Sequence, residues 1–353
     1  MDTLEICYMS AGDLSKLVKN KEVSPVEIID AHLTRIEATE PVLNSFITLL
    51  AEESRTAARQ AEKDIQAGRY KGPLHGIPVG LKDLYNTAGV RTTSGSKIFD
   101  TFVPEEDCTV AAKFQQAGAI LLGKLNMHQF AYGPTGENPD YGHMHNPWNP
   151  EMVTGGSSGG SGSAAAAGQC TITTGSDTGG SIRFPSAACG IVGIKPTWGR
   201  VSRYGVLVLA ESLDHIGPMT RCAADAGIIL QTIAGLDPND PTTLSAPVPP
   251  MLEEIDQGVH GLRIGVDETY ISGNTDPQLA ESVLAGIGVL ERLGAVLVKI
   301  QMPDISDYME AFGVLCSAEA LAAHEATFPS RRDDYGSCLQ GWLDKGATVT
   351  GVE

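Results

Sequence analysis

Apolar residues near the amino terminus recur with the period of an α-helix. Ile29, Leu33 and Ile36 are spaced by four and three residues, which places them on one helical face. The sequence Ser24-Pro25-Val26-Glu27 before them has a capping serine, a proline at the first helical position and a glutamate at the third. This combination predicts a helix that begins at Pro25 and turns its apolar face towards the core.

The pattern changes after the first 70 residues. Before that point, a second helix is predicted from Ala51 to Ala67 and is closed by Gly68, so residues 1–70 are expected to be mainly helical and to pack on the core. From Pro73 onward, short apolar runs such as Ile77–Leu81 alternate with helical stretches. This alternation is typical of an α/β fold.

Residues 110–122 and 277–300 share one local plan. In each segment a helical stretch leads to a glycine, Gly118 or Gly294, that ends the helix, and then to an apolar run that predicts a buried strand. Between the two segments, residues 237–250 are rich in proline and aspartate. This loop indicates a subdomain boundary.

A glycine and serine run, GGSSGGSGSAAAAG, occupies residues 155–168. Its composition alone is typical of a flexible linker. However, the run passes into an alanine-rich helix, then into a predicted strand at 170–174 and a second glycine cluster at 175–190, and linkers rarely lie between core elements. Residues 156–160 also satisfy the G-x-S-x-G elbow of α/β-hydrolases, but the preceding NPEMVT is not a buried strand.

Composition and charge narrow the classes of function. The chain has 353 residues, 42% of them hydrophobic, which is enough for a sizeable core. Its net charge of −18, without a Lys or Arg block longer than two, argues against nucleic-acid binding. No apolar run reaches the length of a membrane span, and MDTLEICYMS does not have the pattern of a signal peptide, so the cytoplasm is the expected location.

Cysteines and histidines give no sign of a disulfide framework or a metal site. The seven cysteines are odd in number, widely scattered and without a C-x-x-C pair, so they are expected to be reduced core residues. His143 and His145 flank Met144, but no third ligand at a recognisable spacing accompanies them. We therefore predict no metal and no organic cofactor.

The stretch from residue 72 to about residue 222 resembles the amidase signature family. Five motifs carry the resemblance, in this order along the chain: GPLHGIPVGLKD (72–83), GAILLGKLNMHQFA (118–131), NPWNPEMVTGGSSGGSGSAAAAG (146–168), GSDTGGSIRFPSAACGIVGIKPTWGRVSRYG (175–205) and SLDHIGPMTR (212–221). The spacings also match, with 75 residues from Lys82 to Ser157 and 24 from Ser157 to Ser181.

The resemblance implies a catalytic triad and a reaction. In that family the serine of GGSIR is the nucleophile, the first serine of GGSSGG is a bridging residue held by a cis peptide bond, and the lysine of G-[IL]-K-D is the base. These are Ser181, Ser157 and Lys82 in this sequence. A serine needs an adjacent base, and a lysine can be that base only when it is neutral. The apolar residues Ile77, Val79 and Leu81 before Lys82 suit that requirement.

Residues around the nucleophile have predicted supporting roles. An oxyanion hole is expected from the backbone amides of Thr178, Gly179, Gly180 and Ser181. Asp177 and Arg183 bracket the nucleophile and are expected to pair with each other and hold its loop, and Ser158 is expected to be a supporting donor. Candidate substrate-binding residues follow the GKLN motif: Met127, Ala131, Tyr132 and Gly133.

The family includes free-standing amidases and the glutaminase subunit of the aspartyl/glutamyl-tRNA amidotransferase. That subunit has a tyrosine-rich stretch before a SxxEA-type helix, where this chain has Phe312 and Gly313, and a later N-L-x-R-[YF]-D-G-[IV]-R segment that this chain does not contain. We therefore predict a free-standing amidase that releases ammonia or an amine from a carboxamide. The glutaminase subunit is the alternative.

The implied fold is α/β, a large mixed sheet covered by helices on both faces, with the site at one sheet edge. Residues 1–70 are predicted to form the helical region and residues 71–353 the amidase domain. Because family members are longer, this domain is expected to be incomplete at its C-terminus. The expected partner is a small amide substrate, with no membrane and no direct nucleic-acid contact, and a homodimer is left open.

Overall fold

A mixed six-stranded β-sheet forms the centre of the larger of two units in this chain. The computed structural model describes residues 1–352. The core unit comprises Met1–Pro250 and Val314–Glu353, and the small unit comprises Met251–Gly313. The loop predicted at 237–250 ends where the small unit begins, whereas residue 70 is not a boundary between the two units.

The strands of the core unit are ordered β1-β3-β2-β4-β6-β5. Strands β3, β2 and β4 are parallel to one another, whereas β1, β6 and β5 run antiparallel to their neighbours. The parallel arrangement brings the carboxyl ends of β2 and β4 to the same edge of the sheet. The strands are β1 (Phe46–Leu49), β2 (Pro78–Lys82), β3 (Ile120–Leu125), β4 (Ile172–Asp177), β5 (Val192–Gly193) and β6 (His215–Thr220).

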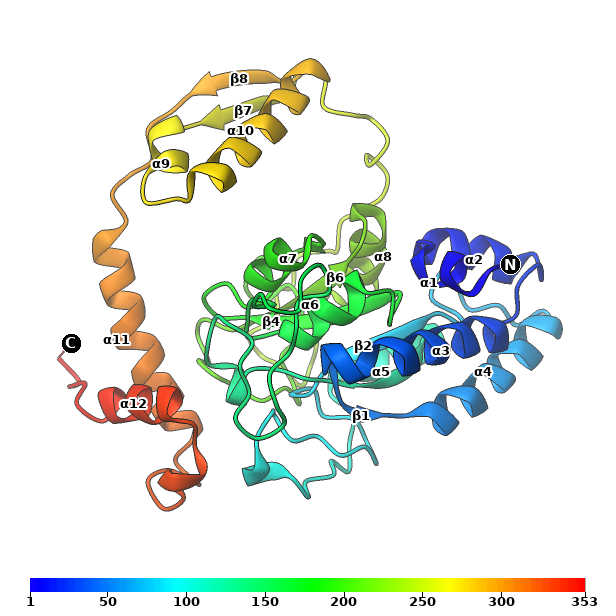
Figure 1. Cartoon of the computed structure of the whole chain (residues 1–353), viewed down its shortest axis with the longest axis horizontal. Helices are drawn as coiled ribbons and strands as arrows, with labels where there is room; N and C mark the ends of the chain where they lie inside the picture. Colours follow the sequence, from blue (N-terminus) through cyan, green and yellow to red (C-terminus); the bar gives the residue numbers. More distant parts are fainter. Residues whose placement is uncertain (353) are drawn as a thin grey trace. The chain divides into compact units, whose positions relative to one another are not determined.

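Helices pack on both faces of this sheet, and α3 and α4 run beside each other in Figure 1. The helices of the core unit are α1 (Thr3–Tyr8), α2 (Ala11–Lys19), α3 (Pro25–Leu43), α4 (Ala51–Gln66), α5 (Thr109–Ala117), α6 (Gly159–Ala166), α7 (Arg183–Cys189), α8 (Ala223–Ile233), α11 (Ser306–Ala323), which begins in the small unit, and α12 (Ser337–Gly346). Short 3₁₀ turns, η1 (Lys97–Phe99), η2 (Gln129–Ala131) and η3 (Arg332–Asp334), complete the core unit.

Side chains of β2 show the two covered faces. Val79 and Leu81 line a groove together with Phe114 of α5. A Cβ at Gly80 would instead contact Leu125 and Cys170. The latter two belong to the main apolar cluster, which also contains residues of α3, α4 and α6. Because successive strand residues point to opposite faces, α5 lies on one face and this cluster on the other. The predicted fold class, an α/β protein with helices on both faces of a mixed sheet, is confirmed.

The predicted helix start signals are present at α3 and the stop signals at α4, α5 and α10. The Ser24 hydroxyl accepts from the Val26 amide, and the Glu27 carboxylate accepts from the Ser24 amide, which completes a capping box. Gly68, Gly118 and Gly294 follow their helices with φ of 80°, 80° and 97°, a conformation that favours glycine. The helix predicted to end at Ala67 ends at Gln66.

The first 70 residues contribute more than helices. Phe46–Leu49 forms β1, which pairs with β3 at the edge of the sheet. The sequence FITL forms a short strand directly before α4, and the prediction of a mainly helical region did not include this strand. The N-terminal region is therefore part of the sheet as well as a layer over it.

The small unit is a βαβ arrangement. It contains β7 (Arg263–Val266), α9 (Glu268–Ser272), α10 (Pro277–Arg292) and β8 (Val296–Lys299), and the two strands pair in parallel. The strand predicted after Gly294 is present, but it is half exposed instead of buried.

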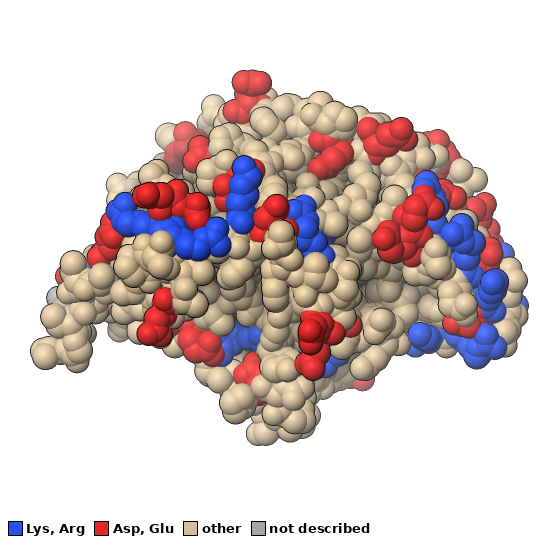
Figure 2. Space-filling view, turned by 90° about the horizontal axis from the view of Figure 1, so that it is seen from below, with Lys and Arg blue, Asp and Glu red and all other residues tan. Residues whose placement is uncertain are grey.

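The surface of the protein carries both acidic and basic side chains. On the face drawn in Figure 2, acidic and basic side chains lie next to one another. Surface ion pairs of the chain include Arg55 with Asp30. None of the helices in residues 1–352 is long and apolar enough to cross a membrane.

The cysteines differ in part from the prediction that all are reduced core residues. All seven are free, but Cys222 is only half buried and Cys338 is exposed, so these two are not core residues.

The glycine and serine run is a packed segment. A Cβ at Gly160, in the first turn of α6, would lie 2.4 Å from the Asn126 carbonyl oxygen and 2.6 Å from that of Ser45. Only glycine permits this approach of three backbone segments. The run is glycine-rich because other chain segments lie against it, and the linker interpretation is wrong.

Gly160→Ala is expected to lower the free energy of unfolding by about 2 to 3 kcal/mol, because the added methyl group must displace backbone atoms. Gly341→Ala is the matched control, since a Cβ there meets nothing within 4 Å on α12, and it should stabilise the protein by up to about 1 kcal/mol. Urea denaturation followed by tryptophan fluorescence measures both, because Trp148, Trp198 and Trp342 all lie in the core unit. Equal midpoints for wild type and Gly160→Ala would contradict the packed assignment.

Candidate active site

Lys82 is the last residue of β2, and its side chain is fully buried. Its Nζ atom lies 2.7 Å from Ser157 Oγ and 2.9 Å from Ser176 Oγ. Ser176 comes from β4, the parallel neighbour of β2. The structure therefore joins two of the three residues of the predicted triad by a direct hydrogen bond, across a separation of 75 residues in sequence.

Burial decides the protonation of this amine. The apolar residues Ile77, Val79 and Leu81 that precede Lys82 are themselves buried. Burial lowers the pKa of Lys82 to about 7, although the more distant carboxylates of Asp214 and Asp177 act in the opposite direction. A substantial fraction of the amine is consequently neutral near pH 7.

Ser157 lies just before α6, and the peptide bond between Gly156 and Ser157 is cis. The residue is fully buried, and its carbonyl oxygen accepts a hydrogen bond from the backbone amide of His128 at 3.0 Å. The next residue, Ser158, is also buried, and its hydroxyl donates to the Ser176 carbonyl oxygen at 3.3 Å. Ser157 and Ser158 are thus held from the start of η2 and from β4.

Ser181 lies in the loop between β4 and α7 and is half buried. Its carbonyl oxygen accepts from the Ser158 amide at 3.3 Å, so this loop and the Ser157 loop are in contact. Within residues 1–352 the Ser181 hydroxyl makes no hydrogen bond to another side chain. The side chains of Ser181 and Ser157 are therefore not joined by a hydrogen bond in this structure.

The Asp177 carboxylate holds the Ser181 loop from inside. It accepts from the backbone amides of Gly180 and Ile182 and from the Arg183 guanidinium, at distances of 2.8, 3.2 and 2.9 to 3.0 Å. Burial alone would raise the pKa of Asp177, but the hydrogen bonds and charge of Arg183 outweigh this effect and hold it below its ordinary value. The carboxylate therefore stays ionised and keeps the loop folded around it.

This arrangement changes the predicted oxyanion hole. The amide of Gly180 points to Asp177 and is not free to bind an oxyanion. The amides of Thr178, Gly179 and Ser181 have no acceptor among the residues that the structure describes. Gly180 is still required for the turn, since its φ is +133° and a Cβ would meet the Phe184 ring at 2.6 Å.

Sequence and structure comparisons place this chain in a known family. The family model described as amidase matches residues 27–347, which is most of the chain. The chain belongs to the amidase signature family. All three predicted triad residues and both glycine-rich loops lie inside the matched region of this amidase-family chain.

Relatives within the amidase family differ in what their names describe. A glutamyl-tRNA(Gln) amidotransferase subunit of Anaeromyxobacter dehalogenans (strain 2CP-C) is 43% identical over 316 residues, covering 90% of this chain. A chain of the vestigial protein complex that reveals the evolutionary origins of an s-triazine catabolic enzyme aligns at a TM-score of 0.92, with 33% identity over 98% of this chain and 75% of that chain. For the peptide amidase of Stenotrophomonas maltophilia the TM-score is 0.87, with 30% identity over 98% of this chain and 76% of that chain. The chain spans 64% of the length of the Anaeromyxobacter relative.

Two site residues of this amidase-family chain were missed from its sequence. Ser176 accepts from Lys82, and Asp214 accepts from the Thr178 hydroxyl at 2.5 Å and from the Leu209 amide at 2.8 Å. Asp214, just before β6, thus anchors the start of the Ser181 loop. Both residues lie inside motifs that carried the family resemblance, GSDTGGS and SLDHIGP. Their place in these motifs was the sequence signal that could have identified them as site residues.

The four predicted substrate residues do not share one location. Tyr132 lines a cavity. Met127 and Ala131 are buried, and Gly133 lies against Gly156 and the His128 ring.

The histidines considered as metal ligands have other contacts. His145 donates to the Pro150 carbonyl oxygen. Among residues 1–352 no group of three or more His, Cys, Asp or Glu side chains is placed to hold a metal ion.

Proposed function

We propose that this chain hydrolyses a carboxamide through an acyl-enzyme on Ser181, with Ser157 as proton relay and Lys82 as base. The observation that carries the proposal is the 2.7 Å hydrogen bond between the fully buried Lys82 amine and Ser157 Oγ. A buried lysine without a carboxylate in hydrogen-bond contact is poised to be neutral, and a neutral amine next to a hydroxyl is a proton acceptor. Contact between the Ser157 and Ser181 loops supports the remaining link.

The proton path follows from this geometry. As Ser181 Oγ attacks the amide carbon, its proton passes to Ser157 Oγ while the Ser157 proton passes to Lys82 Nζ. The protons return along the same path to the leaving nitrogen, so the C–N bond breaks and ammonia or an amine departs. Water then repeats the sequence on the ester, which releases the carboxylate and restores Ser181. Ser176 Oγ holds the Lys82 amine in place throughout.

The negative charge on the carbonyl oxygen needs donors in the Ser181 loop. The free amides of Thr178, Gly179 and Ser181 are available for it, and the Asp177 carboxylate fixes their direction through Gly180 and Ile182. Preorganised amides of this kind stabilise a developing oxyanion without reorganisation during the reaction.

The comparisons support the alternative substrate class over the free-standing amidase predicted from the sequence. That prediction depended on Phe312 and Gly313 and on one absent segment, whereas the Anaeromyxobacter relative, named for its amidotransferase, is 43% identical over 316 residues. We therefore take a primary carboxamide as the substrate, with glutamine as the first candidate, released ammonia as the product and other amidotransferase subunits as partners. Nothing in the comparisons supports a homodimer.

A substrate panel separates these classes. Glutamine, asparagine, small aliphatic amides and aryl amides should be assayed for ammonia and carboxylate, with Ser181→Ala as the blank. Preference for glutamine supports the glutaminase class, and preference for simple aliphatic or aryl amides supports a free-standing amidase.

Ser181 is expected to be the residue that reacts with a fluorophosphonate probe, because it is half buried and lies beside free backbone amides. Mass spectrometry should find the adduct on the peptide that contains Ser181, and Ser181→Ala should abolish it. The matched control is Ser212→Ala, a serine in an exposed loop whose hydroxyl bonds only to Glu319. Labelling that persists undiminished in Ser181→Ala would overturn the assignment.

Lys82→Ala is expected to lower kcat by about 10²- to 10⁴-fold with little change in KM, because it removes the base and not a substrate contact. Ser157→Ala should lose somewhat less, since water can partly replace the hydroxyl. The wild-type kcat should rise with pH through about 7, as the buried amine loses its proton, and then level off. Steady-state rates from pH 5 to 9 measure this, with the exposed Lys63→Ala as control. An unchanged kcat and alkaline limb in Lys82→Ala would rule out this base.

A further inference from the structure

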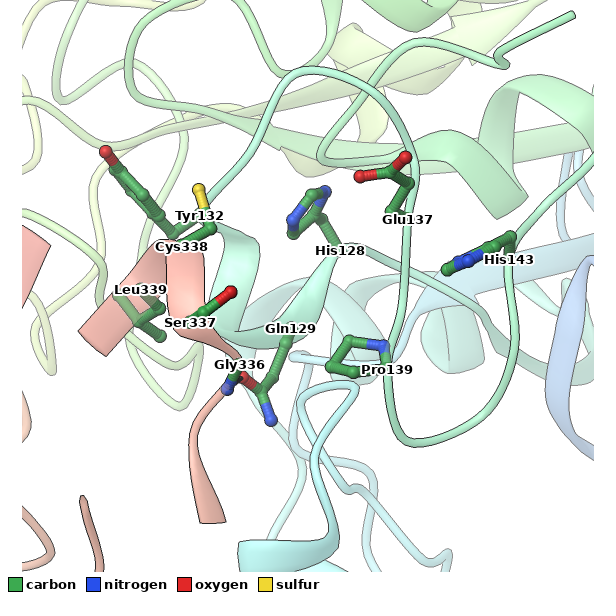
Figure 3. Close-up of a pocket in the computed structure, with 10 residues that line it drawn as sticks. All are labelled: His128, Gln129, Tyr132, Glu137, Pro139, His143, Gly336, Ser337, Cys338 and Leu339. Carbon is green, nitrogen blue, oxygen red and sulfur yellow. Dashed lines mark hydrogen bonds between the residues drawn. The ribbon is translucent and has the colours of Figure 1, made fainter. Parts of the chain in front are cut away.

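A polar cavity lies beside the Ser157 loop, between residues 128–143 and the start of α12. Its volume is about 160 Å³, which is room for one end of a small ligand. Figure 3 shows that His128 and Glu137 extend into the space between the two walls. Both walls belong to the core unit.

The cavity adjoins the triad through His128. The backbone amide of His128 donates a hydrogen bond to the Ser157 carbonyl oxygen at 3.0 Å. The side chain of the same residue lines the cavity. The cavity and the Ser157 loop therefore meet at His128.

His128 is the feature that points to a ligand. His128 is only 8% exposed, and its Nδ1 atom is buried without a hydrogen-bond partner. No residue of the described chain bonds to the other ring nitrogen either. Buried polar atoms are almost always paired in folded proteins, so a histidine ring without partners that lines a cavity points to a ligand there. Burial lowers the pKa of His128 to about 4, which leaves the ring neutral and one nitrogen free to accept a hydrogen bond.

The remaining lining groups favour a donor with positive charge. Glu137 is exposed and is the only Asp, Glu, Lys or Arg among the lining residues, and it makes no hydrogen bond or ion pair within residues 1–352. The hydroxyls of Tyr132 and Ser337 are likewise without partners there. In Figure 3 the Glu137 carboxylate lies on the same side of the cavity as the His128 ring.

The cavity walls are tied together before any ligand binds. Gln129 Oε1 accepts from the Gly336 amide at 2.7 Å, and its Nε2 donates to Asp140 at 2.9 Å. The Tyr132 ring stacks on Trp342 of α12, with ring centroids 5.0 Å apart. These contacts hold the shape of the site, so a ligand does not have to order it.

We propose that this cavity binds the hydrogen-bond-donating, cationic end of the amide substrate, with Glu137 supplying the opposite charge and His128 an acceptor nitrogen. The proposal rests on the function proposed above and makes it more specific: the preferred substrate is a primary amide that carries an ammonium group. His128 and Glu137 are then specificity residues outside the triad.

Paired synthetic amides test this preference. The probes are 4-aminobutanamide, 5-aminopentanamide and 6-aminohexanamide, each compared with the amide in which a methyl group replaces the ammonium group. In the wild type, kcat/KM should be about tenfold higher for the ammonium member of the pair whose length fits best, as expected for a hydrogen bond to a charged group. Equal values for every pair, or a preference for the methyl amides, would overturn the proposal.

Variants assign the preference to the cavity. Glu137→Gln removes the charge at constant size and should lower the ammonium-to-methyl ratio about tenfold, while the values for the methyl amides stay within about twofold. His128→Phe keeps a planar ring without nitrogen atoms and should lower the ratio in the same direction. Glu151→Gln is the matched control, an exposed glutamate outside the cavity, and should keep the wild-type ratio. An unchanged ratio in Glu137→Gln would remove Glu137 from this role.

The two proposals fail in different ways. Amide cleavage and Ser181 labelling without discrimination within any pair would contradict only the cavity assignment. Absence of cleavage and of labelling would contradict the proposed function, and the cavity is then tested by binding alone. Ligand-observed NMR should detect pentylammonium more strongly than 1-pentanol with wild type, and the difference should disappear in Glu137→Gln. Equal binding of the two probes to wild type would overturn the cavity assignment.

Discussion

The site depends on one constraint: a lysine amine is buried at the end of a central strand, and within residues 1–352 only hydroxyl groups are in hydrogen-bond contact with it. Lys82 Nζ has Ser157 and Ser176 as neighbours, while Asp214 and Asp177 act on it only from a distance. A carboxylate in direct contact would keep the amine charged, and exposure to water would do the same. Both carboxylates instead bind the Ser181 loop, one through backbone amides and Arg183 and the other through Thr178.

Close packing of backbone against backbone makes this burial possible. The two glycine-rich loops lie over the carboxyl ends of β2 and β4, and residues such as Gly160 and Gly180 have no room for a side chain. The hydrogen bond from the His128 amide helps to hold the relay serine beside Lys82. The same His128 extends into the adjoining cavity, so the bridging serine and the proposed specificity pocket share one residue.

Local signals predicted much of this structure from the sequence. The capping box at Ser24 and the glycine stops at Gly68, Gly118 and Gly294 act within one turn of chain. Lys82, Ser157 and Ser181 were selected because the motifs that contain them resemble those of the amidase signature family. Features that depend on distant neighbours were missed. Strand β1 is short and has no turn signal. The partner of the Gly180 amide depends on where Asp177 points, and Ser176 reaches Lys82 only because β2 and β4 are adjacent. The cavity is lined by residues about 200 positions apart in the sequence, so no local sequence pattern could predict it.

Direct titration of the Lys82 amine tests the account most directly. Protein labelled with ¹⁵N-lysine can be titrated by NMR, with Lys82→Ala to assign the signal and the exposed Lys63 as an internal reference. The account predicts a midpoint near pH 7 for Lys82, in line with its burial. A Lys82 amine that remains protonated up to pH 10 would contradict the central claim that burial makes this lysine a base.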